Sequence, residues 1–405
     1  MAQLKPFRAV RPAQDKAQRV ACLPYDVLNY EQACRLAEDP ISFVHVIKSE
    51  TDFPEGTDLY APCIYEKAKE NLEALSADGT MIQDDMPCYY IYREITSTHT
   101  QTGFVGTVSC QEYESGIIRR HELTVAEKED DRTRHILTCR AQTGPVFLTF
   151  PDAPEAVQLL NELTAVTPVY DFTQADVRHQ VWVVSKPEQI QQIESVFQNI
   201  PILYIADGHH RAASSNRAAK QAGAADTQEA GRFMAVVFPA DDLSLLGYHR
   251  FVKDLNGHSK ADYLKQLGEC FDVKESRPGL PASVQEISMV LGDAWYTLVP
   301  HTDAYDSSDS ISRLDVSILQ EKLLAPILGI EDPRRDKRIQ FIGGEGAENE
   351  VASLAQAMPE GVGFLLYPTD IHDLIAVAND KRIMPPKSTW FEPKLLSGLF
   401  VHNID

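Results

Sequence analysis

Apolar and polar residues follow one another along the first two thirds of the chain in runs that predict alternating strands and helices. Short apolar runs bounded by turn residues predict strands at Tyr89–Glu94, Phe104–Tyr113, Pro145–Phe150, Val181–Val184 and Ile202–Ala206. Helical spacing or helix-favouring composition predicts helices at Gln32–Asp39, Ala61–Leu75, Glu188–Phe197 and Ala212–Ala222. The polar segment Thr96–Gly103 predicts a hairpin turn. This order favours an α/β (α+β) fold, in which helices cover a mostly parallel or mixed sheet.

The last third of the chain carries a second set of such patterns. The first pattern predicts a pair of neighbouring strands at Phe233–Phe238 and Leu243–Val252. Later strands are expected at Ile287–Leu291, Ala294–Val299 and Gly363–Leu366. Helices are expected at Ala261–Cys270, Val316–Leu324, Glu350–Ala357 and Ile371–Asp380. A polar break at Asn256-Gly257 marks a boundary. Because 405 residues exceed what one core usually serves, we expect three parts: residues 1–115, 116–255 and 256–405, the last an additional α/β lobe.

The junction after the Ile202–Ala206 run concentrates the chemistry of the chain. Asp207-Gly208-His209-His210-Arg211 lies between the predicted strand and the predicted helix. Free N–H groups at a helix N-terminus, with the positive end of the helix dipole, attract phosphate, and Arg211 suits bidentate contact with phosphate oxygens. Asp207 is able to orient a histidine or hold Mg²⁺. The alternative is a capped helix with two solvated histidines.

A second polar segment, Arg119-Arg120-His121-Glu122-Leu123-Thr124, precedes this junction. A carboxylate about 3 Å from a hydroxyl group is able to accept its proton during phosphoryl transfer. As a zinc-protease motif the segment fails, because Val125 occupies the position of the second histidine. The alternative interpretation is a charged surface turn.

Two further segments are candidates for a substrate site. Near the N-terminus, Tyr25 and Asp26 are able to bind the amino or carboxyl group of a small molecule, or merely form a turn. Near the C-terminus, phosphate donors are offered within a proline-braced tail by Lys387, Ser388, Thr389 and Lys394. The alternative role of this tail is to pack or to shape the pocket from outside. The glycines of Gly343–Gly346 lack the Walker pattern and indicate a helix-entry turn.

Charge and composition narrow the classes of partner. The net charge of −21 opposes nucleic-acid binding, which depends on Lys and Arg that release counterions from phosphates. A local cluster of arginines, Arg119, Arg120, Arg132, Arg134, Arg211 and Arg217, remains able to attract a nucleotide. The chain contains neither a bilayer-spanning apolar run nor a secretory apolar region, which predicts a cytoplasmic protein without membrane contact. Seven cysteines without a C-x-x-C pair indicate reduced thiols.

Asp-Gly-His-His-Arg at a strand-to-helix turn resembles the phosphate-binding box of the ParB/sulfiredoxin-like fold, in particular that of the ADP-dependent free serine kinases. The resemblance implies that the box residues Gly208, His209, His210 and Arg211 hold nucleotide phosphates, and we expect Arg120 and Arg132 of the arginine cluster to bind phosphate with them. It also implies that Glu122 is the general base, with His121 and Asp207 beside it. The spacing departs from that pattern, since more chain separates Glu122 from Asp207 than in the small kinases.

The whole chain resembles a widespread bacterial family of conserved domains of unknown function. The segments that carry this resemblance extend from one end of the chain to the other and include Lys5–Pro12, Pro24–Val27, Asp131-Arg132, His249-Arg250 and Met384–Gly398.

These observations predict a phosphotransferase that uses ADP or ATP with Mg²⁺ and acts on the hydroxyl group of a small amino acid, serine or O-phosphoserine. The direction of transfer is open and includes a phosphatase variant. The alternative is a ParB-like regulatory module that binds a nucleotide without phosphorylating a metabolite. A non-catalytic scaffold is the third interpretation. The expected partners are a nucleotide and a small molecule, and a homo-oligomer is left open.

Overall fold

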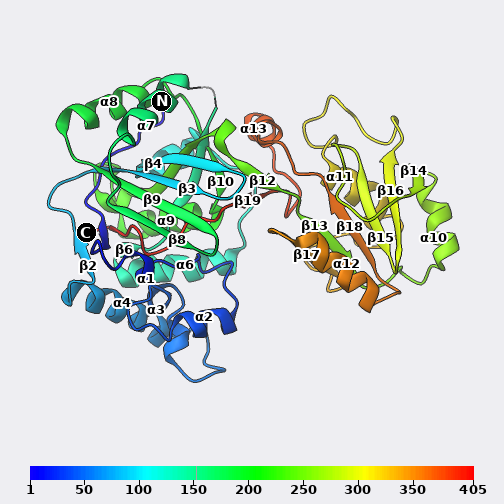
Figure 1. Ribbon diagram of the computed structural model, residues 1–405, viewed down its shortest axis with the longest axis horizontal. Coiled ribbons are helices and arrows are strands. Elements are labelled where there is room, and N and C mark those ends of the chain that lie inside the picture. Colours follow the sequence, from blue (N-terminus) through cyan, green and yellow to red (C-terminus); the bar gives the residue numbers. More distant parts are fainter. Residues whose placement is uncertain (152) are drawn as a thin grey trace. The chain divides into compact units, whose positions relative to one another are not determined.

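The chain forms two compact units (Figure 1) in the computed structural model, which describes residues 1–151 and 153–405. The first unit comprises Met1–Leu243 together with Pro393–Asp405, and the second comprises Ser244–Glu392. The expected boundary at 255/256 therefore lies within the second unit. The expected boundary at 115/116 lies within the first, directly after helix α5 (Cys110–Ser115).

The first unit is built on a mixed eight-stranded sheet, which establishes the α/β class. Its strands, in spatial order, are β5 (Ile118–Arg119), β10 (Leu203–Asp207), β7 (Val146–Phe150), β11 (Arg232–Pro239), β4 (Thr100–Ser109), β3 (Tyr89–Ile95), β9 (Val177–Val184) and β8 (Tyr170–Gln174). Every residue of β7 and β11 is buried, as expected for strands covered on both faces. Two small sheets pair β1 (Val10–Pro12) with β2 (Met81–Gln83) and β6 (Ala141–Gln142) with β20 (His402–Asn403).

Helices surround this sheet and complete its core. Those of eight or more residues are α4 (Pro62–Ala77), α6 (Ala126–Cys139), α7 (Pro154–Leu163), α8 (Pro187–Phe197) and α9 (His209–Ala222), and the shorter ones besides α5 are α1 (Ala17–Val20), α2 (Tyr30–Leu36) and α3 (Val44–Ile47). The predicted helices around Ala61–Leu75 and Glu188–Phe197 are confirmed as α4 and α8. Phe197 of α8 packs edge-on against Phe104 of β4, with ring centroids 5.4 Å apart.

Several elements of the first unit differ from the sequence-based expectation, among them one strand end and one long helix. The predicted strand Phe104–Tyr113 ends at Ser109, because the Ser109 hydroxyl accepts a hydrogen bond from the backbone N–H of Glu112 at 3.1 Å and thereby begins α5. Helix α6 was not predicted at all. Its buried face consists of Thr133, His135, Ile136 and Cys139, which do not form an apolar stripe in the sequence.

The second unit contains a six-stranded sheet in the order β14 (Phe271–Glu275), β16 (Ala294–Pro300), β15 (Ile287–Leu291), β18 (Val362–Leu366), β13 (His249–Val252) and β17 (Ile339–Ile342). All of its neighbouring pairs are antiparallel. Its helices are α10 (Lys260–Leu267), α11 (Asp315–Leu319), α12 (Ala347–Ala357) and α13 (Ile371–Asn379), and β12 (Ser244–Leu246) pairs with β19 (Trp390–Glu392). Gly346 immediately precedes α12, which confirms the helix-entry interpretation of that glycine run.

The predicted pairing of Phe233–Phe238 with Leu243–Val252 is wrong. Strand β11 pairs with β4 and β7 in the first unit, whereas β12 and β13 pair with strands of the second. A short 3-10 turn at Ala240–Asp242 ends the β11 segment at the border between the units. Two consecutive apolar runs therefore belong to different sheets. Among the described residues, no helix has the length and apolarity needed to cross a membrane.

A polar cavity of about 480 Å³ in the second unit contains a carboxyl group with an unusual protonation state. Burial raises the pKa of Asp315 to about 7. A hydrogen bond from the backbone N–H of Gln285, at 2.7 Å, lowers this pKa, but the effect of burial is larger. Asp373, another residue of the cavity wall, adds a further upward shift. The folded chain therefore retains a proton on Asp315 up to near neutral pH, well above the range in which an unfolded aspartate loses it.

Replacing this carboxyl group should make the protein more stable at alkaline pH. Between the unfolded pKa near 4 and the folded pKa near 7, the native state binds more protons than the unfolded chain, so wild-type stability falls as pH rises through that range. Asp315→Asn keeps an acceptor for Gln285 and removes the titration. We expect it to raise the free energy of unfolding by up to about 4 kcal/mol at pH 8, from about three pKa units at 1.36 kcal/mol each, with little change at pH 4. Urea unfolding at both pH values tests this, and a difference that is the same at both contradicts it.

Candidate functional site

The predicted strand, glycine turn and helix around residue 208 are confirmed, and the helix begins earlier than expected. Strand β10 ends at Asp207, and α9 begins at His209, so that His209, His210 and Arg211 form its first turn. Gly208 has a φ of +86°, in the left-handed region that favours glycine. A Cβ at this position would lie 2.9 Å from Nε of Arg211. Glycine therefore permits both the turn and the close approach of the guanidinium group.

The guanidinium of Arg211 is buried against this turn, with the residue only 8% exposed. It donates to the backbone carbonyl of Pro145, and its other terminal nitrogen lies 3.4 Å from Oδ2 of Asp207. Within the described chain its Nε has no hydrogen-bond partner. Burial alone would lower the pKa of Arg211, but the carboxylates of Asp26 and Asp207 outweigh it and raise that pKa. Arg211 is thus a positively charged group held in place by its contacts, and its Nε–H donates no hydrogen bond within the described chain. Both properties suit it to bind an anion.

Asp207 is held between two cations. Its Oδ2 lies 3.6 Å from Nζ of Lys394 and 3.4 Å from the Arg211 guanidinium. Burial tends to raise the pKa of Asp207, but Lys394 and Arg211 overcome this effect and hold the pKa well below its usual range. The carboxylate is therefore ionised and already neutralised. Its assignment as an Mg²⁺ ligand remains a prediction.

The His121-Glu122 segment lies beside the same turn because two strands run in parallel. Strand β5 pairs with β10 so that Ile118 faces Leu203 and Arg119 faces Tyr204. The loop that leaves β5 and the turn that leaves β10 consequently reach the same edge of the sheet. Oε2 of Glu122 lies 3.9 Å from Nδ1 of His209. The rings of His121 and His209 meet edge-on, at 90° and with centroids 4.5 Å apart.

Both of these histidines are neutral at physiological pH. His121 is 2% exposed and His209 is 6% exposed. Burial lowers the pKa of His121 to about 4, against small upward effects of the Ile205 backbone and Asp207. Burial and the neighbouring His121 hold the pKa of His209 well below its ordinary value. The interface between the β5 loop and α9 thus presents uncharged imidazoles next to the Glu122 carboxylate.

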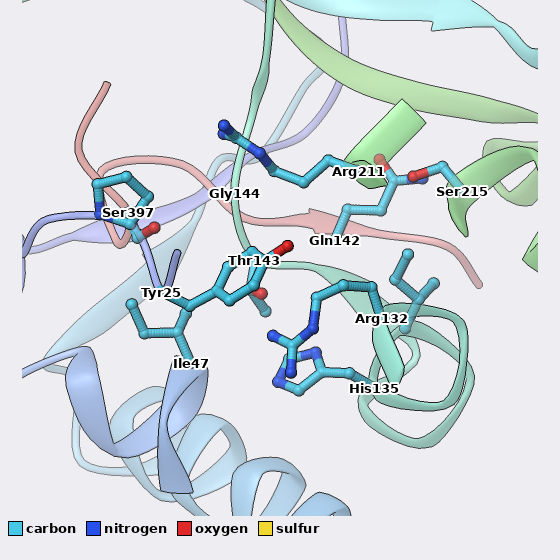
Figure 2. A pocket seen from close by; sticks show the side chains of 12 residues that line it. Tyr25, Ile47, Arg132, His135, Gln142, Thr143, Gly144, Arg211, Ser215 and Ser397 are labelled. Carbon is cyan, nitrogen blue, oxygen red and sulfur yellow. The ribbon is translucent and has the colours of Figure 1, made fainter. Parts of the chain in front are cut away.

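A small cavity opens on the other side of Arg211 and is lined by Pro24, Tyr25, Ile47, Arg132, His135, Ile136, Gln142, Thr143, Gly144, Arg211, Ser215 and Ser397. In the view of Figure 2, Tyr25 and Thr143 lie between the side chains of Arg211 and Arg132. The cavity has a volume of about 30 Å³, which accommodates a few atoms. The cavity therefore suits a carboxylate or phosphoryl group and is too small for a nucleotide.

The electrostatics of the cavity favour an anion. The Arg132 guanidinium lies 4.3 Å from the centroid of the Tyr25 ring, and its Nε donates to Oδ2 of Asp131 at 2.8 Å. Burial and the charge of Asp26 raise the pKa of Tyr25 to about 12, although Arg132 and Arg211 oppose the shift. Its hydroxyl group is therefore protonated and able to donate. Two cations and a phenolic donor line the same space.

The other residues of the first unit that were predicted to bind a ligand are His210, Arg120 and Asp26. Nε2 of His210 accepts a hydrogen bond from the backbone N–H of Val125 at 3.0 Å. Arg120 is exposed and lies over the Tyr113 ring, 5.9 Å from its centroid. Asp26 is exposed at the turn that carries Tyr25. Their predicted roles in binding are compatible with these positions and remain predictions.

Lys387 and Ser388 belong to the second unit. The hydroxyl of Ser388 donates to the carbonyl of Pro385 at 2.6 Å, and Nζ of Lys387 lies 5.4 Å from the centroid of the Tyr248 ring. Both contacts lie within that unit, as the packed-tail interpretation expects. A role for either residue in substrate binding stays a prediction.

Sequence reasoning did not assign several residues that line the first unit's site. They are Thr143, Ser215 and Ser397, and all three line the small cavity. Ser397 belongs to the C-terminal motif and was recognisable as a polar member of it. Lys394 of the same motif was predicted as a phosphate donor, and its Nζ lies 3.6 Å from Oδ2 of Asp207. Thr143 and Ser215 carry no signal in the sequence, because a single hydroxyl residue beside an apolar run is common in any protein.

This chain belongs to the family described as "Protein of unknown function (DUF1015)", whose model matches residues 4–317. The expected membership of a family of unknown function is thereby confirmed, and the family description assigns no reaction. None of the curated proteins compared matches the chain.

Several solved structures show a weak likeness to the chain. A free serine kinase in complex with AMP is 12% identical, with a TM-score of 0.34, and the alignment covers 71% of this chain and 86% of that one. SbnI with a C-terminal truncation, from Staphylococcus aureus, is 13% identical with a TM-score of 0.39, covering 72% and 85%. A conserved hypothetical protein from Pyrococcus furiosus is 12% identical with a TM-score of 0.35, covering 72% and 94%. At these scores the likeness carries no argument about the activity of this chain.

Proposed function

We propose that this protein is a phosphotransferase that moves a phosphoryl group between an adenine nucleotide and the hydroxyl group of a small amino acid, serine or its O-phosphate. The observation that carries the proposal is the position of a buried cation and a carboxylate on either side of one glycine turn. Arg211 has its unpartnered Nε against Gly208, and Glu122 lies 3.9 Å from His209, the next residue. Phosphoryl transfer needs both an anion site and a proton acceptor.

The nucleotide phosphates bind at the first turn of α9 in this proposal. The backbone N–H groups of His209, His210 and Arg211 precede the first helical hydrogen bond, which Ala212 donates to Gly208. N–H groups at a helix N-terminus attract phosphate oxygens, and the positive end of the helix dipole adds to the attraction. The ammonium of Lys394 and the guanidinium of Arg211 lie close by, at Asp207. Binding of Mg²⁺ by Asp207 would require Lys394 to leave that carboxylate, which frees its ammonium for a phosphate oxygen.

Glu122 acts on the hydroxyl group of the acceptor. In the direction of serine phosphorylation, the hydroxyl oxygen forms a bond to the terminal phosphorus of the nucleotide while the bond from that phosphorus to the bridging oxygen breaks. The hydroxyl proton passes to Glu122. In the reverse direction a protonated Glu122 returns the proton to the serine oxygen as it leaves phosphorus, and water in place of the nucleotide would give a phosphatase. Arg211 stabilises the charge on the transferred group.

The small cavity provides an anchor for the amino acid. Its size suits a single carboxylate or phosphoryl group, and Arg132, Arg211 and the hydroxyl of Tyr25 supply the donors. Because Arg211 faces both the cavity and the Gly208 turn, an amino acid anchored in the cavity has its hydroxyl group near the nucleotide. Asp26, whose charge raises the pKa of Arg211, is the proposed partner of the amino group.

Labelled phosphate distinguishes this activity from simple nucleotide binding. Wild-type protein is incubated with serine and ADP or ATP in the presence of Mg²⁺, and in reverse with O-phosphoserine and AMP or ADP. We expect transfer in at least one direction, with threonine or serine methyl ester as poorer substrates because they crowd or neutralise the anchor site. Nucleotide binding without transfer in either direction contradicts the proposal and favours the regulatory-module interpretation. Duplex DNA, which the acidic surface should repel, serves as a negative control.

A further inference from the structure

Three residues that the fold brings together form a donor set of the kind that binds transition metals. One ring nitrogen each of His121 and His209 and one carboxylate oxygen of Glu122 all lie within 4.8 Å of one another. Metal–ligand bonds of about 2.0–2.2 Å hold tetrahedral ligands about 3.5 Å apart. Small rotations of these side chains are therefore enough to enclose an ion, and no movement of the backbone is needed.

Buried nitrogen atoms without partners are the second observation. Both ring nitrogens of His121 and Nε2 of His209 are shielded from solvent and make no hydrogen bond of acceptable geometry in the described chain. Such atoms are uncommon in native proteins, and a bound ion or water is a usual explanation. The backbone of Ile205 lies against His121, and a second partner of this kind determines which ring nitrogen faces a metal.

The position of the second histidine explains why no motif revealed this set. In a helical zinc motif the second histidine would stand where this chain has Val125. Here the second imidazole comes instead from the first turn of α9, which the parallel pairing of β5 with β10 places beside the His121-Glu122 loop. Two imidazoles and one carboxylate are the ligands of many catalytic zinc sites.

We propose that His121, Glu122 and His209 bind a divalent transition-metal ion, Zn²⁺ in the first place. Imidazole nitrogen suits Zn²⁺, whereas Mg²⁺ prefers oxygen ligands, so this site is distinct from a magnesium ion carried by nucleotide phosphates. Three protein ligands leave at least one coordination position for water or for an oxygen of a bound molecule. The inference goes beyond the proposed phosphotransferase function and does not depend on it, because binding of the ion is measured without any reaction.

Metal titration of the full-length chain, without a polyhistidine tag and after treatment with a chelator, tests the site. Isothermal calorimetry with Zn²⁺ should show one tight site per chain, and Co²⁺ should give the visible absorbance of a four- or five-coordinate ion. We expect His209→Gln and His121→Gln each to weaken Zn²⁺ binding at least 100-fold and to abolish the cobalt bands. Mg²⁺ in millimolar excess should not compete.

His210→Gln is the matched control, because His210 occupies the same turn and its Nε2 is engaged by Val125 rather than by the cluster. This variant should bind Zn²⁺ with wild-type affinity and stoichiometry. Glu122→Gln, measured in the same way, should weaken binding at least tenfold, and circular dichroism shows whether each variant is folded. The proposal is overturned if wild type has no tight site, or if folded His121→Gln and His209→Gln proteins bind Zn²⁺ as wild type does. Metal bound equally well by every variant would belong to another part of the chain.

Discussion

Glu122→Gln should reduce the rate of phosphoryl transfer by about 10²- to 10⁴-fold while nucleotide affinity changes little. Glutamine keeps the size of the side chain but cannot accept the hydroxyl proton, and general bases contribute a rate factor of this order. The measurement is turnover of labelled phosphate at saturating substrate, together with the Kd of the nucleotide from calorimetry. A loss confined to turnover is the signature of a group that acts in the transition state.

The control for this variant is Glu155→Gln, which makes the same chemical change at an exposed glutamate in the first turn of α7. It should have wild-type turnover. Equal turnover of Glu122→Gln and wild type would remove Glu122 from the mechanism. Since Glu122 also belongs to the proposed metal site, turnover is compared with and without added Zn²⁺: a defect that persists in metal-free protein is assigned to the base.

Arg211→Lys should weaken nucleotide binding by about 10- to 100-fold, equivalent to about 1.5–3 kcal/mol, the usual contribution of hydrogen bonds to a charged group. Lysine retains the positive charge, but it cannot donate to the Pro145 carbonyl, lie against Asp207 and contact a phosphate at the same time, as the guanidinium is placed to do. Calorimetric titration with ADP and AMP measures the effect. The loss should be larger for ADP, which carries the additional phosphate.

Arg217→Lys is the matched control, because Arg217 lies on the same helix and pairs at the surface with Glu129 and Asp130. It should leave the Kd unchanged, since an exposed pair of this kind contributes little. Melting temperatures of both variants show whether folding is affected. An Arg211→Lys protein that is folded and binds ADP as wild type does would exclude phosphate contact by Arg211.

The local elements around the site were predictable because the relevant signals are local. Ile202–Ala206 is a short apolar run ended by a glycine, and the alanine-rich segment after it strongly favours helix. The structure confirms both, as β10 and α9. Only the first turn of α9 was missed, because the polar residues His209 and His210 are as typical of a loop as of a helix.

Some of the elements that were missed depend on tertiary contacts, whereas α7 was missed although its buried residues, Ala156, Leu159, Leu160 and Leu163, have helical spacing. Strand β5 has two residues and is defined by its pairing with β10, so no periodicity is available to reveal it. Helix α6 buries His135 and Cys139 against neighbouring elements rather than presenting an apolar stripe. The strands after Leu243 were assigned to the wrong partner because consecutive apolar runs usually pair, and here the chain passes into another unit between them.

The sequence by itself determined the family, the α/β class, and a strand, glycine turn and helix at Gly208 with Arg211 beside the turn. Each of these follows from neighbouring residues, whose conformational preferences and chemistry do not require the rest of the chain. Only the tertiary structure decided that Glu122 lies 3.9 Å from His209, that Lys394 neutralises Asp207, and that Tyr25 shares a cavity with Arg132 and Arg211. These contacts join residues that are far apart in the chain. The order and register of the strands bring them together, and burial of side chains across the whole sheet selects that order and register.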